Sequence, residues 1–141
     1  RMDSYFDSSR KKFVRATPEE AVRQAVVSWL KDVLNVPSHL IETEFALRLF
    51  DSRNADRVDI LVHDFREGAT AKEPWLLVEC KRPGVESPAA LQVQVNKYLR
   101  ILKPKFIMLS LGESAIFLQL DPQRKTYIRI PKLPIYPSAN L

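Results

Sequence analysis

Three charged side chains interrupt otherwise apolar segments, and their types and spacing favour metal-assisted hydrolysis. Asp59 lies within the run RVDILV, and Glu79 and Lys81 close the run WLLVECK. Strand residues two apart share a face, so Glu79 and Lys81 point the same way, and an antiparallel neighbour places Asp59 across from Glu79. Because an unpartnered charge is costly to bury among apolar side chains, we expect a metal or a polar cleft here.

Two carboxylates and one amine in a small volume fit the hydrolysis of a phosphodiester. Mg²⁺, or Mn²⁺ in its place, prefers carboxylate oxygens, so the expected ligands are Asp59 and Glu79, with the carbonyl of Cys80 as a third. Lys81 would orient or deprotonate the attacking water, or neutralise charge at phosphorus. A lysine suits this position because an arginine does not give up its proton.

Two helices with clear start signals are expected to flank these segments. Thr17 and Pro18 form an N-cap and a first-turn proline, and the apolar spacing that follows predicts a helix to about Leu34. The same signature begins a second helix at Pro88, which Pro104 brings to an end. Residues 1–16 show neither helical nor strand periodicity and are predicted to form a basic arm.

Runs of β-branched, aromatic and aliphatic residues predict the strands. A meander of three is expected between the helices and three more after the second, at residues 41–50, 56–64, 73–81, 105–111, 114–120 and 126–130. The fold class is therefore α/β (α+β mixed), in the order α-β-β-β-α-β followed by a closing β pair, with a central mixed sheet flanked by helices. One domain over residues 17–131 is expected, with an extended C-terminal tail at 132–141.

Composition fits a single globular domain and excludes several classes of protein. The chain has 141 residues and a net charge of +5, which favours a polyanionic partner such as nucleic acid. One cysteine and two histidines cannot supply a disulfide framework or a standard zinc site. No apolar run is long enough for a membrane span and no signal segment opens the chain, so we expect a cytoplasmic protein without a membrane partner.

The motif spacing resembles that of a known nuclease superfamily. Asp59, followed after twenty residues by Glu79-Cys80-Lys81, resembles the PD-(D/E)xK nucleases. The wider pattern TPEEAVRQ, RVDILVHD and LLVECKRP is similar to the N-terminal nuclease domain of type I restriction enzyme R subunits, over roughly residues 17–112. This resemblance implies a restriction-endonuclease-like core and Mg²⁺-dependent cleavage of DNA. Val58 replaces the family's proline and 110–112 reads Ser-Leu-Gly where Thr-Asn-Gly is frequent, but neither departure removes a metal ligand.

The resemblance also implies two supporting features on the helices. A glutamate of the first helix would lie near the metals, and Gln94 with Tyr98 fits the glutamine and tyrosine of the second helix. At about 100° per residue, Glu19 lies on the flank of the apolar stripe and Glu20 nearly opposite it. We therefore expect Glu19 to be a catalytic residue and metal ligand and Glu20 to belong to the cap, although Glu19 and Arg23 also fit a simple salt bridge.

Several cations are candidates for contacts with a phosphate backbone, which position a nucleic acid without reading its sequence. With one aromatic residue, the candidate nucleic-acid-binding residues are Lys11, Lys12, Arg23, Arg82, Lys97, Tyr98 and Arg100. A solvated basic surface is the alternative interpretation of the cations. For Gln94 and Tyr98 the alternatives are a surface amide and a core aromatic.

Two functions from different classes are consistent with these residues. The first is a Mg²⁺-dependent deoxyribonuclease, either an endonuclease or an exonuclease. It would act by itself, as a homodimer, or with a separate motor or recognition subunit. Any coupling to ATP would come from that subunit, because the sequence has no P-loop. RNA and branched or single-stranded DNA stay open as substrates. The second is a non-catalytic nucleic-acid-binding or assembly module that retains the nuclease fold. The intact set Asp59, Glu79 and Lys81 favours the first.

Overall fold

The computed structural model describes residues 3–67, 72–81 and 87–137. The α-helices in these ranges are α1 (Pro18–Asp32) and α2 (Pro88–Tyr98). The strands are β1 (Ser4–Asp7), β2 (Lys12–Arg15), β3 (Ile41–Ala46), β4 (Arg57–Val62), β5 (Leu76–Cys80), β6 (Phe106–Ser110), β7 (Ala115–Asp121) and β8 (Thr126–Ile130).

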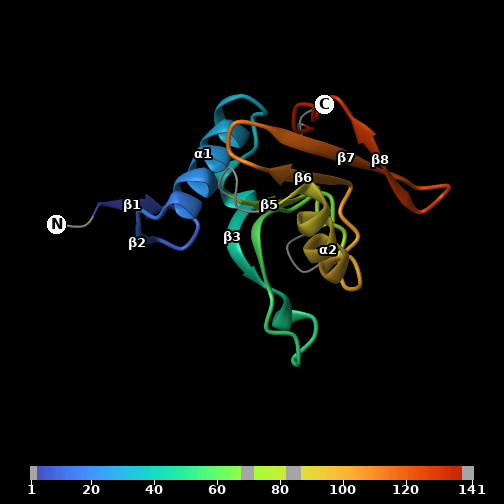
Figure 1. Cartoon of the computed structure of the whole chain (residues 1–141), viewed down its shortest axis with the longest axis horizontal. Helices are drawn as coiled ribbons and strands as arrows, with labels where there is room; N and C mark the ends of the chain where they lie inside the picture. The colour runs from blue at the N-terminus through green and yellow to red at the C-terminus, as the bar shows by residue number, and fades with distance from the viewer. Residues whose placement is uncertain (1–2, 68–71, 82–86, 138–141) are drawn as a thin grey trace.

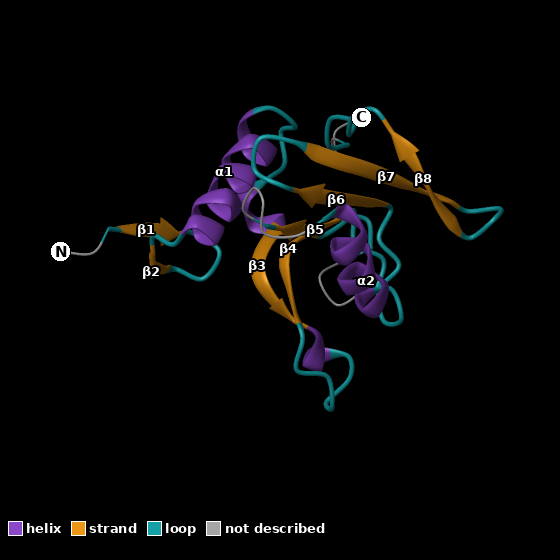
Figure 2. Cartoon of the chain, in the orientation of Figure 1, coloured by secondary structure: helices purple, strands orange, loops and turns teal. Residues whose placement is uncertain are grey.

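Strands β3 to β8 form one six-stranded sheet in sequence order, and β1 and β2 form a separate two-stranded sheet. All neighbouring pairs are antiparallel except β5 and β6, which run parallel because the chain crosses back through α2 between them. Figure 1 shows α1 and α2 on opposite sides of this sheet, and Figure 2 shows the strands fanning between them. The expected mixed α/β class is therefore confirmed.

Local signals explain where the main elements begin and end. The Thr17 hydroxyl accepts the N–H of Glu20 at 3.1 Å, which caps α1, and Asn35, with φ of 59°, stops the helical path after it. The strand expected over 41–50 ends at Ala46, where a 3₁₀ turn over Leu47–Leu49 begins. The strand expected over 73–81 ends at Cys80, so Lys81 lies just beyond it.

The sheet separates two apolar cores. The α1-side core joins buried residues of α1 to alternate residues of β5, namely Leu76, Val78 and Cys80. The α2-side core joins Leu77 of β5 to the buried residues of α2, including Tyr98. A strand buried on both faces, as β5 is, reads as a continuous apolar run, so the buried carboxylate within it at Glu79 is exceptional.

In strands β3 and β4 the regular alternation of side chains between the two faces of the sheet is interrupted, and the two interruptions lie opposite each other. Ile41 packs in the α1-side core and Phe45 in the α2-side core, although four residues of regular strand would keep them on one face. Between them Glu44 has a φ of 52°, which is strained for a residue with a side chain. In β4, Ile60 packs on the α1 side and Val58 on the α2 side. In β4 the interruption therefore lies between Val58 and Ile60, at Asp59.

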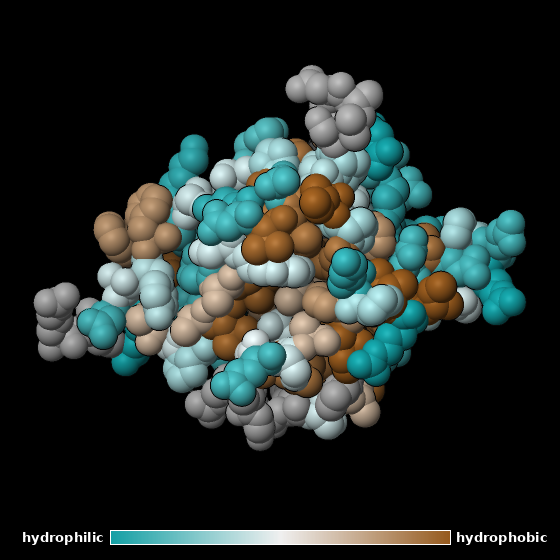
Figure 3. Space-filling model, turned by 90° about the horizontal axis from the view of Figure 1, so that it is seen from above, coloured by the Kyte–Doolittle hydropathy of each residue, from teal (hydrophilic) through white to brown (hydrophobic). Residues whose placement is uncertain are grey.

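The first sixteen residues contain a β-hairpin in place of the irregular arm expected from the sequence. Asp7 is buried, and its Oδ1 accepts the N–H of Ser9 and Arg10 at 2.8 and 2.9 Å, which closes the turn. Its Oδ2 accepts the Thr43 hydroxyl at 2.7 Å, which fastens the hairpin to β3. Strands of four residues are too short for an alternating pattern to reveal them. Figure 3 shows a brown apolar patch at this end of the molecule.

The C-terminal tail, as far as the structure describes it, lies against the domain without forming a helix or strand. The Tyr136 N–H donates to the Leu34 carbonyl at 2.8 Å, and the Tyr136 hydroxyl donates to the His63 carbonyl at 2.7 Å. Of the helices in the described ranges, none has the length and apolarity that a membrane crossing requires.

Candidate active site

The candidate site lies where β4 and β5 separate. Their ladder consists of the pairs Val62↔Leu76, Leu61↔Leu77 and Ile60↔Val78, and the next residues along the two strands are Asp59 and Glu79. Here the backbone N–H of Cys80 donates to Oδ2 of Asp59 at 2.7 Å. A side-chain carboxylate thus takes the place of a further ladder bond, which holds Asp59 beside β5.

Asp59 and Glu79 are the next residues after the last ladder pair of β4 and β5, and the charge of Asp59 acts on the Glu79 carboxyl, so the structure brings the two acids close together. Glu79 is only 4% exposed. Burial and then the adjacent charge of Asp59 raise the pKa of Glu79 to about 9, against the opposing effects of Lys81 and the Tyr98 hydroxyl. The raised pKa marks a place where the nearby positive charge does not offset burial and the neighbouring carboxylate.

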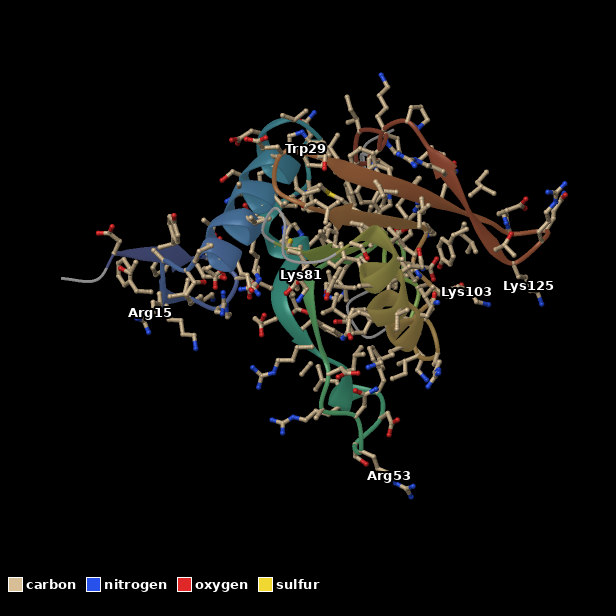
Figure 4. All side chains as sticks on the ribbon, viewed as in Figure 1. Arg15, Trp29, Arg53, Lys81, Lys103 and Lys125 are labelled. Carbon is tan, nitrogen blue, oxygen red and sulfur yellow. The ribbon has the colours of Figure 1, made fainter. Side chains whose placement is uncertain are left out.

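Lys81 lies within electrostatic reach of this acid pair, because its charge acts to lower the pKa of Glu79. Its backbone N–H donates to the Ser110 carbonyl at 2.8 Å, which extends the parallel pairing of β5 with β6 by one residue. The residue is half-buried, and Figure 4 shows it at the centre of the view, whereas Arg15, Arg53 and Lys125 lie toward the periphery.

Arg23 connects α1 to the acid pair. Its guanidinium contacts Oε1 of Glu20 and Oε1 of Glu44 at 2.7 Å each, and Oδ1 of Asp59 at 3.0 Å. Burial opposes the charge of Arg23, but the hydrogen bond to Asp59 and the surrounding carboxylates raise its pKa above the ordinary value. The expected role in binding nucleic acid does not fit a guanidinium held by three acids, and Arg23 instead orients Asp59.

The expected placement of the two glutamates at the start of α1, with Glu19 toward the core and Glu20 away from it, was wrong. Glu19 is exposed, whereas Glu20 is buried and accepts bonds from Arg10 at 2.8 Å, Arg23 at 2.7 Å and Gln24 at 3.2 Å. The N-terminal hairpin covers the flank that carries Glu20, and Arg10 from that hairpin draws its carboxylate inward.

Gln94 and Tyr98 form a relay that ends on Glu79. The Gln94 Nε2 donates to the Tyr98 hydroxyl at 3.0 Å, and that hydroxyl lies 3.0 Å from the Arg57 carbonyl and 3.3 Å from Oε1 of Glu79. Burial, and then the charge of Glu79, raise the pKa of Tyr98. Tyr98 is 2% exposed, so the expected contact with nucleic acid does not fit it, and it supports the Glu79 carboxyl instead.

The other predicted residues divide between core and surface. The Cys80 side chain is buried in the α1-side core, opposite the Tyr98 contact of Glu79, and burial raises its thiol pKa. Four of the candidate nucleic-acid-binding residues are exposed, namely Lys11, Lys12, Lys97 and Arg100. Arg82 lies outside the described residues.

Sequence reasoning missed the acids that hold Arg23. The spacing of Glu20 and Arg23, three residues apart on a helix, was an available signal for a salt bridge. Glu44 offered no such signal, because its place opposite Asp59 depends on the ladder register and its φ angle cannot be read from the segment IETEFA.

Comparison with known proteins identifies the family. Neither a search of curated proteins nor a search of solved structures gave a match. The family model described as Type I restriction enzyme R protein N terminus matches residues 18–134, which begins at the first residue of α1 and extends past β8. This range includes Arg23, Asp59, Glu79 and Lys81, while the N-terminal hairpin precedes it. The chain therefore belongs to the family of type I restriction enzyme R protein N-terminal domains.

Proposed function

We propose that this chain is a divalent-metal-dependent deoxyribonuclease domain of a restriction system. The observation that carries the proposal is the buried Glu79 carboxyl beside Asp59, because burial and then the charge of Asp59 raise the pKa of Glu79 to about 9. Strong pKa perturbation of a buried acid by a like charge is typical of functional sites. The sequence motif and the family membership support the same chemistry independently.

The donor set fits Mg²⁺ or Mn²⁺ better than a softer metal. Asp59 and Glu79 offer hard oxygen atoms, and the Cys80 carbonyl is a third donor of the same kind. Within the described ranges no three His, Cys, Asp or Glu side chains gather as a ligand set, so a bound ion would complete its shell with water and phosphate oxygens. Mg²⁺ commonly binds in this way, through one or two carboxylates.

When bound, the metal would supply charge to hold the scissile phosphate and to acidify the attacking water. The protein groups have separate tasks. Lys81 orients or deprotonates that water, or offsets charge developing at phosphorus. Arg23 fixes the orientation of Asp59 through the 3.0 Å contact, and the relay from Gln94 through Tyr98 does the same for Glu79. Glu20 is committed to Arg10 and Arg23, so its task is to position Arg23.

The proposal includes the fold assignment and the partners. In this proposal the domain is a restriction-endonuclease-like core, and the order of helix α1, strands β3 to β5, helix α2 and strands β6 to β8 supports it. DNA is the substrate. Because R subunits belong to restriction enzymes of several parts, a separate ATP-dependent motor or recognition subunit is the protein partner we propose, and a second copy of this chain is the alternative.

One observation favours a second candidate function, a non-catalytic nucleic-acid-binding or assembly module. Arg23 already places a positive charge 3.0 Å from Asp59, and a fixed cation there neutralises part of the charge that a metal would meet. In that case the carboxylates would serve to hold α1 against the sheet. Glu79 argues for the nuclease, because Arg23 leaves its pKa raised to about 9.

A cleavage assay separates the two functions. Supercoiled plasmid and linear DNA are incubated with the parent chain in Mg²⁺, Mn²⁺ or chelator, beside Asp59→Asn and Lys81→Met. Each variant should cut at least about 100-fold more slowly, the usual range for loss of a positioned catalytic group. Asparagine keeps an oxygen for the Cys80 N–H, so the fold should persist, which circular dichroism checks.

Asp51→Asn and Lys132→Met are the matched controls, because both residues are exposed and Asp51 bonds only within its own turn. Both should cut like the parent. Cleavage that survives chelation, or that Asp59→Asn leaves unchanged, would contradict the nuclease proposal. DNA binding without cleavage in the parent chain would favour the assembly module.

A further inference from the structure

The outer face of the N-terminal hairpin carries a pair of exposed aromatic rings. Phe6 and Phe13 are direct cross-strand partners, with ring centroids 5.3 Å apart in an edge-to-face arrangement. They remain 55% and 70% exposed. A cross-strand aromatic pair stabilises a hairpin, but a pair needed only for that purpose would gain more by facing the domain.

Positive charge surrounds this aromatic pair. Lys11, Lys12 and Arg15 are all exposed, and Arg15 shares the face of Phe13, two residues away on β2. The acid within the hairpin, Asp7, is 1% exposed and turned inward, while the exposed Asp3 precedes the first strand. The surface therefore combines aromatic rings with an excess of cations, which complements a polyanion that also offers flat rings.

The hairpin is joined to the candidate active site by a continuous chain of ion pairs. Arg10 contacts Asp7 at 2.7 Å and Glu20 at 2.8 Å, Glu20 contacts Arg23 at 2.7 Å, and Arg23 contacts Asp59 at 3.0 Å. The aromatic face is thus held in a fixed relation to the acid pair. A ligand bound at the acid pair would therefore find the aromatic face at a fixed position relative to that pair.

We propose that this face, Phe6 and Phe13 with Arg15, together with the neighbouring exposed cations Lys11 and Lys12, binds an unpaired stretch of nucleic acid beside the Asp59–Glu79 site. The rings stack on exposed bases, and the cations contact the phosphates. Bases inside a duplex already stack on one another, so the face selects single-stranded or opened segments. The inference rests on the proposed function for its substrate class, and it adds a preference that the acid pair alone does not give.

Fluorescence anisotropy of the whole chain with a labelled oligonucleotide tests the proposal. The strand is longer than about 16 nucleotides, so that it can cover a stacking surface, and it is compared with its own duplex. Chelator prevents cleavage. The double variant Phe6→Ala with Phe13→Ala should raise the Kd for the single strand by roughly tenfold or more, with a change below about twofold for the duplex.

Leu49→Ala is the matched control, because Leu49 is 72% exposed on the connection between β3 and β4. It should leave both affinities unchanged. A second variant, Phe6→Leu with Phe13→Leu, keeps apolar side chains for the hairpin but has no rings, and it should lose single-strand affinity like the alanine variant. Retained affinity in the leucine variant would overturn the stacking proposal.

Two further outcomes would overturn it. One is a parent chain that does not bind the single strand, or binds it as tightly as the alanine variant does. The other is a change in sedimentation behaviour, from dimer to monomer, with DNA affinity intact, which would make the face a protein contact. A cleavage assay in Mg²⁺ runs in parallel. Ring-dependent binding without cleavage by the parent chain would end the proposed nuclease function and leave this inference standing.

Discussion

Strand β4 has a buried carboxyl near each end, Asp64 of the segment that follows it and Glu79 of the neighbouring β5, and the pKa values of the two shift in opposite directions. Beyond its last residue, Asp64 is fully buried, yet Arg66 and Lys105 outweigh the effect of burial and hold its pKa near 2. At its other end Asp59 faces Glu79, and burial together with that like charge raises the pKa of Glu79 to about 9. Burial acts the same way on both acids, so the difference lies in the charges that face them.

This contrast distinguishes an acid that holds the fold together from one that, under the proposed function, would bind a metal. Asp64 accepts bonds from Arg66 at 2.9 and 3.0 Å and pairs with Lys105, which joins the β4 end to the start of β6. Glu79 has Tyr98 and the influence of Lys81, and these do not offset Asp59. Two neighbouring carboxyls are costly to keep where apolar residues would pack, and the proposed divalent cation would offset that cost.

The largest stability effect is expected from Glu79→Gln. The parent holds a proton on Glu79 that the unfolded chain releases above its ordinary pKa of 4.5, so the metal-free parent loses stability as the pH rises from there toward 9. The variant has no such proton. In chelator, the free energy of unfolding of the variant minus that of the parent should increase by up to about 1.4 kcal/mol per pH unit between pH 5 and pH 8.

Urea unfolding of both proteins at the two pH values measures this increase. Equal stability at both pH values would mean that Glu79 is charged in the folded chain, and the contrast with Asp64 would vanish.

Asp64→Asn should have the opposite consequence. A folded-state pKa lowered from 3.8 to about 2 stabilises the protein at neutral pH, and that contribution is lost as the pH falls through this interval. The variant should therefore unfold with about 2 kcal/mol less free energy at pH 7, and the deficit should shrink toward acid pH. Thermal unfolding at pH 7 and at about pH 2.5 checks both parts, because only the lower pH lies within this interval. A deficit that grows in acid would contradict the assignment.

Tyr98→Phe should give the smallest effect, about 1 kcal/mol of stability for the lost hydroxyl. Because the hydroxyl lowers the pKa of Glu79, its removal should also move the Glu79 titration to higher pH, measured by carboxyl NMR. Tyr127→Phe is the control. Its hydroxyl donates to the Pro104 carbonyl at 2.6 Å, so its loss should cost similar stability and leave the Glu79 titration unchanged.

Much of the site was predictable because it depends on local patterns. Asp59, Glu79 and Lys81 stood out as charges in apolar strands, and the antiparallel pairing of those strands was enough to place the two acids near each other. The two helix caps were read from Thr17-Pro18 and Ser87-Pro88, and both cap hydroxyls accept the expected N–H groups. These features need no knowledge of distant contacts.

The rest depends on tertiary contacts that leave no local trace. Glu20 is buried because Arg10 of a hairpin lies beside it, and the hairpin itself rests on the Asp7 contacts with its turn and with Thr43. The interruption in β3 at Glu44 follows from its φ of 52°, which no propensity would assign to a glutamate. Arg23 could be named as a cation of interest, but its three partners required the ladder register.

The most direct test of the central claim is calorimetry of Mn²⁺ binding at pH 7 in two buffers of different ionisation enthalpy. If Asp59 and Glu79 jointly hold the ion, binding must displace the Glu79 proton, so close to one proton should pass to the buffer. Asp59→Asn should abolish binding, and Asp64→Asn should preserve both the affinity and the proton release. Binding without proton release, or binding that Asp59→Asn leaves intact, would contradict a metal shared by these two carboxylates.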